Sequence, residues 1–396
     1  MHSVEDAVAA VAARIQRLDA QRVPLADARR RFLAETIVAP RSLPGFANSA
    51  MDGYAVRSSE LPATFPIHST VAAGHPITEA IPERVAVRIF TGAPMPVELD
   101  TVVMQEDATV EDSGNVTLPA AAAGENVRLA GEDIAAGERA VDSGTRLGPG
   151  ELGLLAALGV ADVPCTRRPR VAIIATGDEL VDVSSPLEPA QIVDSSQYSL
   201  AALIRDAGGE PDYIGIAKDD PITMAALIAS ALDHDVVITT GGVSVGDRDH
   251  VRAALASAGV TLELYKVAMK PGKPFSFGMN NHVPVFGLPG NPVSTYVAFE
   301  LFVRPALLAM QGAAVTQRPR APVVLAHGYR KQAGRAHFIR ATVVRNGEHL
   351  IAHPHPKQGS AILSSLVGCN ALVELGAELE LVEPNTVMPA ILFEAV

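Results

Sequence analysis

The residues best suited to chemistry lie in the stretch Val236 to Asp249, which reads VVITTGGVSVGDRD. Its β-branched start is typical of a buried parallel strand. Gly241, Gly242 and Gly246 follow, and glycines let backbone N–H groups approach an anion that a Cβ would keep away. Because carboxylates beside such a loop repel an anion unless a cation lies between them, the stretch predicts a phosphorylated ligand bridged by Mg²⁺. The alternative is a glycine-rich turn in which Asp249 caps the next helix.

Two further loops are predicted to share an edge with this one. Thr176 to Leu180 (TGDEL) follows a predicted strand, and Leu288 to Ser294 (LPGNPVS) follows the apolar run Val283–Phe286. Ligands of open parallel sheets bind at the carboxyl ends of the strands, so the loops are expected to line one crevice. Ser294 opens a helix there and is placed to meet an oxyanion. Asp219 and Asp220 end the strand between these loops.

A lysine-rich turn lies between the loops in sequence. Lys266, Lys270 and Lys273 fall within eight positions beside a Pro-Gly turn, and lysine is a compact point charge suited to phosphate. They predict an anion cradle; the alternative is a solvated basic turn. Between Val315 and Lys357 the only acidic residue is Glu348, so this segment presents a basic face to the crevice or simply a solubilising surface.

The elements that must position these residues follow from hydrophobic patterning. The segment 171–310 alternates strands and helices, which predicts an α/β unit with a mostly parallel sheet. Its predicted strands are Val171–Ala175, Asp212–Ala217 and Asp235–Thr240, and its predicted helices are about Ser196–Ala207, Pro221–Leu232, Arg248–Ala258 and Val293–Met310.

The flanking regions have different patterns. Val4–Leu18 carries a helical apolar stripe, and Val23–Arg41 is helix-compatible until its proline. Residues 65–141 contain short β-branched runs between Gly and Pro clusters, which indicate a β-rich module. Pro149–Gly159 predicts a short helix, a Pro/Arg linker puts a domain boundary near residue 168, and the runs after about residue 314 indicate a small β domain.

Composition excludes several classes of protein. The chain has 396 residues, 48% of them hydrophobic, and a net charge of −12, which argues against non-specific binding to nucleic acid or to an anionic membrane. Cys165 and Cys369 form neither a metal-ligand spacing nor a disulfide framework. No run approaches the ~18 apolar residues of a membrane span, so a soluble, cytoplasmic protein of two to four domains is expected.

The motifs together resemble a known family. NSAMDGYAV, RIFTGAPMP, GEDI, ATGDEL, TTGGVSVGDRD, KPGKPFSFG, GLPGNPVS and QGS are similar, in order and over essentially the whole chain, to the molybdopterin molybdenumtransferases, the family of bacterial MoeA and the gephyrin E domain. The related molybdopterin adenylyltransferases typically read TGGTG where this chain has TGGVS at 240–244. This difference and the extra domains favour the molybdenum-inserting branch.

The resemblance implies an architecture. It comprises a helical linker domain from residues 1–45 and 138–168, an inserted β-rich domain at 46–137, an α/β molybdopterin-binding domain at 169–313, and a C-terminal β domain at 314–396. It also implies homodimers, in which the active site lies between the α/β domain of one chain and the inserted domain of the other.

The resemblance assigns roles to residues. Functional positions match Asp52, Thr91, Asp133, Glu179, Asp219, Asp249, Lys266 and Lys270. The molybdate pocket matches Lys270, Lys273, Ser294, Arg340 and Ser360, with Arg335 as a neighbouring candidate for Arg340. The pterin and its phosphates are expected at Thr176, Gly177, Asp178, Gly241, Gly242, Ser244, Gly246, Pro289, Gly290, Asn291 and Pro292, and Mg²⁺ at Asp219, Asp249 and Glu179.

The implied reaction takes adenylylated molybdopterin and molybdate, releases AMP with the help of Mg²⁺, and inserts molybdenum into the dithiolene. A molybdopterin adenylyltransferase and molybdoenzymes or their chaperones are the implied transient partners. The alternatives are an adenylyltransferase acting on the same pterin and a gephyrin-like scaffold. Intact Lys270, Lys273 and Ser294 weigh against a purely structural role, and molybdate and tungstate would meet the same charges.

Overall fold

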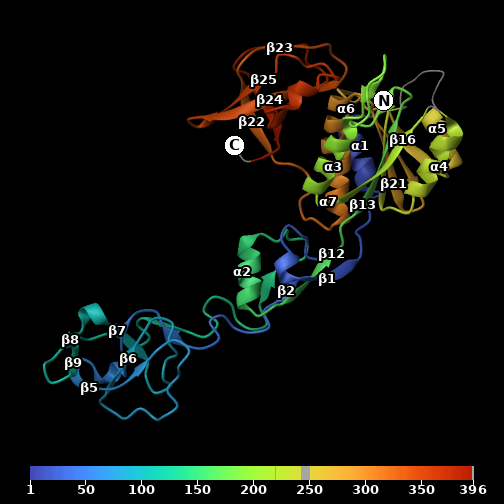
Figure 1. The fold of residues 1–396 in the computed structure, drawn as a ribbon. Coiled ribbons are helices and arrows are strands. Elements are labelled where there is room, and N and C mark those ends of the chain that lie inside the picture. The colour runs from blue at the N-terminus through green and yellow to red at the C-terminus, as the bar shows by residue number, and fades with distance from the viewer. Residues whose placement is uncertain (219, 242–249, 395–396) are drawn as a thin grey trace.

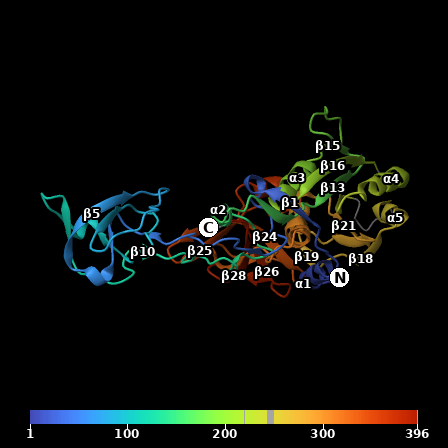
Figure 2. The ribbon, with the colours of Figure 1, turned by 90° about the horizontal axis from the view of Figure 1, so that it is seen from below.

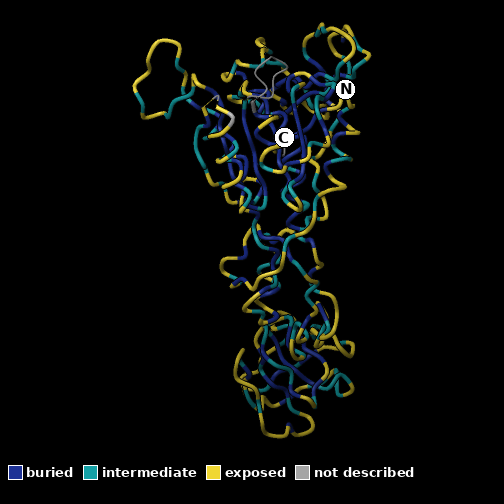
Figure 3. The backbone as a smooth tube through the Cα atoms, turned by 90° about the vertical axis from the view of Figure 1, so that its right-hand side faces the viewer, coloured by how far each residue is buried: buried dark blue, intermediate teal, exposed yellow. Residues whose placement is uncertain are grey.

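The protein has an elongated shape with most of its buried backbone at one end (Figures 1 and 3). The computed structural model describes residues 1–218, 220–241 and 250–394. An α/β body and the C-terminal β sheet lie together at one end, and a β-rich module lies at the other (Figure 1). Between them the chain passes through a narrow helical and stranded segment, which Figure 2 shows from another side.

The α/β body contains the mostly parallel sheet that the sequence predicts. The strand order is β16 (Glu210–Ala217), β13 (Arg170–Thr176), β17 (Val236–Thr240), β21 (Val283–Leu288), β20 (Ser276–Asn280) and β18 (Thr261–Tyr265). The first four strands are parallel, and β20 runs antiparallel to both of its neighbours. The carboxyl ends of β13, β17 and β21 therefore lie at one edge.

Helices cover both faces of this sheet. Along β13, Val171 and Ile173 face the core shared with α1, α3, α6 and α7, whereas Ala172 and Ile174 face the core shared with α4 and α5, as the two-residue period of a strand requires. The helices are α1 (Val4–Ala12), α3 (Ser196–Asp206), α4 (Pro221–Ala231), α5 (His250–Ser257), α6 (Pro292–Ala298) and α7 (Arg304–Met310).

The predicted helix Val293–Met310 is interrupted. A π-helical segment, Phe299–Val303, separates α6 from α7. Pro305 has no N–H to bond the carbonyl of residue 301, and such losses accompany wider turns. By length and apolarity the segment Pro292–Met310 would qualify to cross a membrane, but 83% of it is buried inside the protein, as in the core helix of many folded proteins.

The first 41 residues differ from the prediction. Helix α1 ends at Ala12 rather than at Leu18, although Ile15 and Leu18 still pack on the α/β core. The prediction that Val23–Arg41 is helix-compatible was wrong, because this segment contains the end of β1 (Ala20–Pro24) and the whole of β2 (Ile37–Val38). Strand β1 pairs with β12 (Asp162–Thr166) and β2 with β11 (Arg139–Val141), so pairing distant in sequence overrides local propensity.

The β-rich module is confirmed as a six-stranded sheet in the order β7–β4–β6–β5–β9–β8. The strands are β4 (Gly53–Val56), β5 (Ala63–Val71), β6 (Ala86–Ile89), β7 (Thr101–Met104), β8 (Thr109–Val110) and β9 (Asn115–Leu118). Strand β3 (Asn48–Ser49) pairs with β10 (Val127–Arg128), and helix α2 (Pro149–Ala157) lies between the β-rich module and the α/β body (Figure 1).

The C-terminal β sheet closes on itself, because β24 pairs with both β25 and β26. Its strands are β19 (Met269–Lys270), β22 (Arg320–Leu325), β24 (Ala336–Asn346), β25 (His349–Pro354), β26 (Ala371–Leu375) and β28 (Val387–Leu392). Strand β19 belongs to the lysine-rich turn and pairs in parallel with β24, so this turn joins the C-terminal sheet to the α/β body. Two further short pairs lie outside the main sheets: β14 (Leu180–Val181) with β15 (Ile192–Val193), and β23 (Tyr329–Arg330) with β27 (Leu381–Val382).

Candidate functional site

The three predicted loops meet at the carboxyl edge of the parallel sheet. Thr176 Oγ1, at the end of β13, donates to Thr240 O at 2.9 Å. Gly241 N, just past β17, donates to Leu288 O at 3.0 Å, at the end of β21. The beginnings of the three loops therefore share one rim, while residues 242–249 of the second loop lie outside the described residues.

Position 241 requires glycine for two reasons: its backbone conformation is unfavourable for other residues, and a side chain would have no space there. Its φ is +88°, and a Cβ there would lie 2.6 Å from Thr176 O. On the other side, a Cβ at Gly290 would lie 3.3 Å from the Gly241 Cα. The backbones of the three loops are thus in contact, and side chains are excluded where they meet.

Acidic residues of the TGDEL loop stand on the solvent side of this edge. Asp178 and Glu179 are exposed. Gly177 has a φ of +148°, and a Cβ there would lie 2.7 Å from Glu179 Oε2, so the Glu179 carboxylate folds back over the glycine. Lys218 Nζ donates to Asp178 O at 3.1 Å, which ties the end of β16 to the loop.

A cavity adjoins the rim. Its volume is 230 Å³, and it brings together residues of the lysine-rich turn, the loop after β21 and the C-terminal sheet. Those with side-chain functions are Lys270, Lys273, Asn291, Ser294, Arg335, Gln358 and Ser360. Pro289 also lines this cavity, and the next residue, Gly290, contacts Gly241, so the cavity and the glycine loop share a wall.

Hydrogen bonds fix the cavity wall. Asn291 Nδ2 donates to Ser360 Oγ at 3.1 Å, and Val293 N donates to Ser360 O at 3.1 Å. Ser294 is buried at the start of α6. These bonds cross from the α/β body to the C-terminal sheet, so the cavity lies at a junction between two cores.

Arg340 does not line the cavity. Its side chain is fully buried, and it donates from Nε to Ser365 Oγ at 3.1 Å and from Nη2 to Gly359 O at 3.0 Å. It therefore lies behind the loop that carries Gln358 and Ser360. The structure places Arg335, the neighbouring candidate, on the cavity wall instead.

Lys266 stands apart from the cavity-lining lysines. Its backbone has a φ of +66°, which is uncommon for a residue with a side chain. Its ammonium lies 4.9 Å from the centroid of the Tyr265 ring. Lys270 and Lys273 line the cavity, whereas Lys266 does not.

Asp52 and Thr91 form a unit in the β-rich module. Asp52 Oδ1 accepts from the backbone N and from the Oγ1 of Thr91, each at 2.7 Å. These bonds, the backbone one first, lower the pKa of Asp52. Gly53, which begins β4, leaves no room for a side chain, because a Cβ there would lie 2.0 Å from Val103 O.

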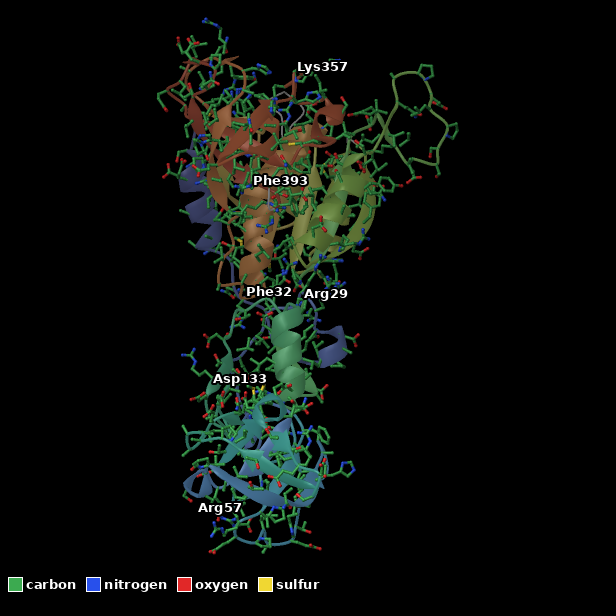
Figure 4. The ribbon with its side chains drawn as sticks, turned by 90° about the vertical axis from the view of Figure 1, so that its left-hand side faces the viewer. Arg29, Phe32, Arg57, Asp133, Lys357 and Phe393 are labelled. Carbon is green, nitrogen blue, oxygen red and sulfur yellow. The ribbon has the colours of Figure 1, made fainter. Side chains whose placement is uncertain are left out.

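Within one chain, Asp52 and Thr91 do not lie near the loops at the carboxyl edge of the parallel sheet. The β-rich module lies at the far end of the molecule from the α/β body (Figure 1). In Figure 4, Asp133 lies in the half of the molecule that holds that module, whereas Lys357 lies at the opposite end. Asp52, Thr91 and Asp133 are thus separated in one chain from the cavity. The expected residues Asp219, Gly242, Ser244, Gly246 and Asp249 lie outside the described residues.

Sequence reasoning missed several residues of this region. Arg335 was only a second choice, while Gln358, Arg330, Lys331 and His337 were not proposed as site residues. Gln358 accepts from Arg340 N at 3.1 Å and lies on the cavity wall. The available signal was the excess of basic residues between 315 and 357, which is a property of composition and does not select individual side chains.

Family models match most of the chain. Residues 2–159 match the MoeA N-terminal region (domain I and II), residues 172–309 a probable molybdopterin binding domain, and residues 322–393 the MoeA C-terminal region (domain IV). These matches follow the order of the sheets described above.

Individual proteins are similar over nearly their full length. A molybdopterin molybdenumtransferase of Haemophilus influenzae is 38% identical over 89% of this chain and 89% of its own length. Molybdopterin molybdenumtransferase 2 of Mycobacterium tuberculosis is 36% identical over 98% of both chains. The crystal structure of a molybdopterin biosynthesis MoeA protein from Pyrococcus horikoshii matches with a TM-score of 0.86 and 31% identity, covering 99% of this chain and 100% of that one. With this sequence, these three regions and this fold, the chain belongs to the MoeA family, the molybdopterin molybdenumtransferases.

Proposed function

We propose that this protein transfers molybdenum from molybdate to adenylylated molybdopterin, with release of AMP. The observation that carries the proposal is the shared wall between two anion-binding features, the glycine loop at Gly241 and the cavity lined by Lys270 and Lys273. One feature suits a phosphate and the other a second, tetrahedral anion. Both substrates of an adenylyltransferase are phosphate compounds, and neither is a free tetrahedral oxyanion, so a separate oxyanion cavity favours the insertase.

The residues of the cavity suit a doubly charged oxyanion. Lys270 and Lys273 supply ammonium groups, Arg335 a guanidinium, and Ser294 and Ser360 hydroxyl donors. Charge-assisted hydrogen bonds from such groups would hold molybdate beside the bound pterin. No cluster of three or more His, Cys, Asp or Glu suited to a metal ion occurs within residues 1–218, 220–241 and 250–394.

We also propose Mg²⁺ at Asp219, Asp249 and Glu179. The structural support is the exposed Glu179 carboxylate, which folds back over Gly177 at the rim and offers the hard oxygen ligands that Mg²⁺ prefers. Bound there, Mg²⁺ would withdraw charge from the bridging phosphate of the adenylylated pterin. Lys218, which donates to Asp178 O, would hold the loop in place.

The proposed assembly is a homodimer with composite sites. Its support is the separation of Asp52, Thr91 and Asp133 from the cavity of the same chain (Figure 4), which the β-rich module of a second copy would remove. The proposed units are residues 1–45 with 138–168, 46–137, 169–313 and 314–396. The proposed setting is the cytoplasm, with a molybdopterin adenylyltransferase and molybdoenzymes or their chaperones as transient partners.

The test is release of AMP by the full chain given adenylylated molybdopterin, Mg²⁺ and molybdate. We expect AMP release that depends on molybdate, and a product that reconstitutes an apo-molybdoenzyme. Lys273→Ala should raise the molybdate concentration needed for half-maximal release at least tenfold and change pterin binding little. Lys357→Ala, which removes an exposed lysine whose side chain does not line the cavity, is the matched control.

Two results would overturn the proposal. One is formation of adenylylated molybdopterin from ATP and free molybdopterin without molybdate, which would indicate an adenylyltransferase. The other is absence of any reaction by a folded dimer that binds the pterin, which would indicate a scaffold.

A further inference from the structure

Arg88 lies across the strands that carry the Asp52–Thr91 unit. It belongs to β6 and is paired with Tyr54 of β4 in the antiparallel ladder. Its guanidinium lies over two aromatic rings, 5.1 Å from the centroid of Tyr54 and 4.9 Å from that of Phe90. Because a cation is attracted to the face of an aromatic ring, these contacts favour a guanidinium that lies against the sheet over one that extends into solvent.

The guanidinium of Arg88 makes hydrogen bonds on both sides of the Asp52 turn. Arg88 Nη1 donates to Gly53 O at 2.8 Å, and Nη2 donates to Gln105 Oε1. Gln105 N in turn donates to Asp52 O at 3.0 Å. Arg88 therefore holds the residue that follows Asp52 and the residue that binds the Asp52 carbonyl. Arginine suits this task because its planar fork presents two donors in a fixed geometry.

Arg88 and Thr91 hold different parts of the same turn. Thr91 donates both of its bonds to the Asp52 carboxylate, whereas Arg88 bonds to backbone and amide groups around it. The two residues are three positions apart, in β6 and just past its end. Asp52 stays partly exposed and Thr91 exposed. The end of one strand thus fixes both a carboxylate and the backbone that carries it, while leaving the carboxylate accessible.

Arg88 also has a packing role. Tyr54 is 6% exposed and belongs to the core that includes Val56, Phe65 and Val103. The guanidinium of Arg88 lies over the Tyr54 ring and so covers the edge of this core. A test of Arg88 must therefore separate an effect on Asp52 from an effect on the stability of the β-rich module.

Arg57 offers that separation, because it makes similar bonds at the opposite end of β4. Arg57 Nη1 donates to Pro82 O at 2.7 Å, and Nη2 donates to Ile81 O at 2.9 Å. Figure 4 shows Arg57 in the outer part of the module, away from the rest of the chain. Both arginines thus brace the module through two bonds, and the bonds of Arg88 are those beside Asp52.

We propose that Arg88 is a positioning residue for Asp52. Its bonds to Gly53 and Gln105 hold the Asp52 turn in the orientation that the carboxylate needs in the site of a second copy. This proposal rests on the proposed function, in which Asp52 completes a composite site. It adds a residue that acts through the backbone of Asp52 rather than by touching substrate. Loss of geometry at such a residue lowers turnover more than it weakens substrate binding.

The experiment compares AMP release by Arg88→Met, Arg88→Lys and Arg57→Met with that of the wild type. Arg88→Met keeps the apolar stem, and Arg88→Lys keeps the charge without the two-donor fork. We expect both Arg88 variants to lower kcat at least about tenfold and to change the KM for molybdate less than about twofold, because the cavity residues are untouched. Arg57→Met should keep the kcat of the wild type.

The titration of Asp52 gives a second readout that does not require the reaction. The bonds from Thr91, and after them the charge of Arg88, lower the pKa of Asp52. The carboxyl ¹³C signal of Asp52 should therefore titrate at higher pH in Arg88→Met than in the wild type. Glu106 of η3 (Gln105–Asp107), a titratable group next to this turn, is followed in the same spectra.

Heterodimers show where Arg88 acts. An Arg88→Met chain paired with a Lys270→Ala chain contains one composite site with both parts intact, so activity should recover. Paired with an Asp52→Ala chain, the Arg88→Met chain should give no recovery, because every site then has a damaged β-rich module. Equal recovery in the two pairs would contradict a shared role of Arg88 and Asp52.

Three further results would overturn the proposal. An equal loss of kcat in Arg88→Met and Arg57→Met would mean that Arg88 acts only through the stability of the module. Full activity of Arg88→Lys would leave no role for the fork. An Asp52 titration unchanged in Arg88→Met would exclude an effect on Asp52, whatever the activity. Absence of AMP release by the wild type would instead overturn the proposed function, and the Asp52 titration would still decide the role of Arg88.

Discussion

Asp52 accepts two hydrogen bonds from Thr91 through a single carboxylate oxygen, each at 2.7 Å. One comes from the backbone and one from the hydroxyl, so the carboxylate is both oriented and held ionised on an accessible turn of the β-rich module. The depressed pKa of Asp52 has this cause. A group whose pKa is lower when folded favours the folded state above its unfolded pKa, and that contribution is lost as the pH falls through the folded pKa.

We predict that Thr91→Val raises the pKa of Asp52 toward its ordinary value, because the hydroxyl donor is lost while the backbone donor stays. The carboxyl ¹³C signal of Asp52, followed from pH 6 to pH 2, measures this pKa. Thr70→Val, at an exposed position of β5 in the same module, is the control and should leave that titration unchanged. An Asp52 pKa that is the same in Thr91→Val and wild type would mean that the backbone bond alone sets it.

A substitution at Arg340 can show whether this buried arginine supports the wall of the cavity lined by Lys270 and Lys273 or binds an anion in it. We predict that Arg340→Met lowers the free energy of unfolding by about 3 kcal/mol, because Ser365 Oγ loses a donor in a buried setting and Gly359 O loses one in a partly buried setting. Urea unfolding followed by circular dichroism measures the change. The Arg340 side chain is fully buried and is not among the residues that line the cavity.

Arg335→Gln is the matched comparison, because Arg335 lines the cavity and is only partly buried. It should weaken molybdate binding about tenfold and change the unfolding free energy by less than about 1 kcal/mol. The opposite pattern, with normal stability but lost molybdate binding in Arg340→Met, would restore Arg340 as a direct ligand.

Gly241 allows a test of close approach between the rim loops. Gly241→Ala combines a positive φ with a Cβ 2.6 Å from Thr176 O. Gly74 has a φ of +81°, and no atom lies within 4 Å of an added Cβ. Gly74→Ala therefore measures the cost of the positive φ without a steric clash. We predict a cost of about 1 kcal/mol for Gly74→Ala and at least about 2 kcal/mol more for Gly241→Ala, since overpacking adds to it. Equal costs in urea unfolding would show that the rim relaxes freely.

The α/β body was predictable because its signals are local. The β-branched runs of β13, β17 and β21 end in Thr176, Thr240 and Leu288, and the loops that follow contain glycines where backbones must touch. Parallel pairing then brings the loops to one edge. The family resemblance added the lysines and serines that line the cavity beside the rim.

The remainder depends on contacts between distant segments. Strand β1 forms only by pairing with β12, roughly 140 positions further along the chain, and no local period of residues 23–41 records this. The pairing of Lys270 with His337 across β19 and β24 is equally remote, which is why sequence reasoning found the lysine and missed the histidine. Arg335 lines the cavity while Arg340 is fully buried, a difference that two arginines five positions apart do not reveal in sequence.

A buried ion pair links the interrupted helix to the C-terminal sheet. Glu300 accepts from Arg318 Nε at 2.6 Å and from Nη2 at 3.0 Å, and Arg318 Nη1 donates to Phe393 O. We predict that Arg318→Met lowers the free energy of unfolding by about 3 kcal/mol or more, because it leaves the carboxylate of Glu300 buried with little compensation. The double variant Glu300→Gln with Arg318→Met should recover part of this loss. A double variant less stable than the sum of the two single changes would contradict the ion-pair explanation.

The last prediction concerns the two ends of the molecule, where Asp52 and Lys270 lie far apart in one chain. If active sites form between copies, a heterodimer of an Asp52→Ala chain and a Lys270→Ala chain contains one site with both residues intact and one site with neither. We predict that each homodimeric variant loses most AMP release and that the purified heterodimer, made with two different affinity tags, recovers up to about half of the wild-type rate. The control pairs Lys270→Ala with Lys273→Ala, two changes on the same cavity wall. Each site of that heterodimer carries one damaged wall, so no recovery is expected. Activity of the Asp52→Ala and Lys270→Ala heterodimer no higher than that of this control would place both residues in separate functions and reject the composite site.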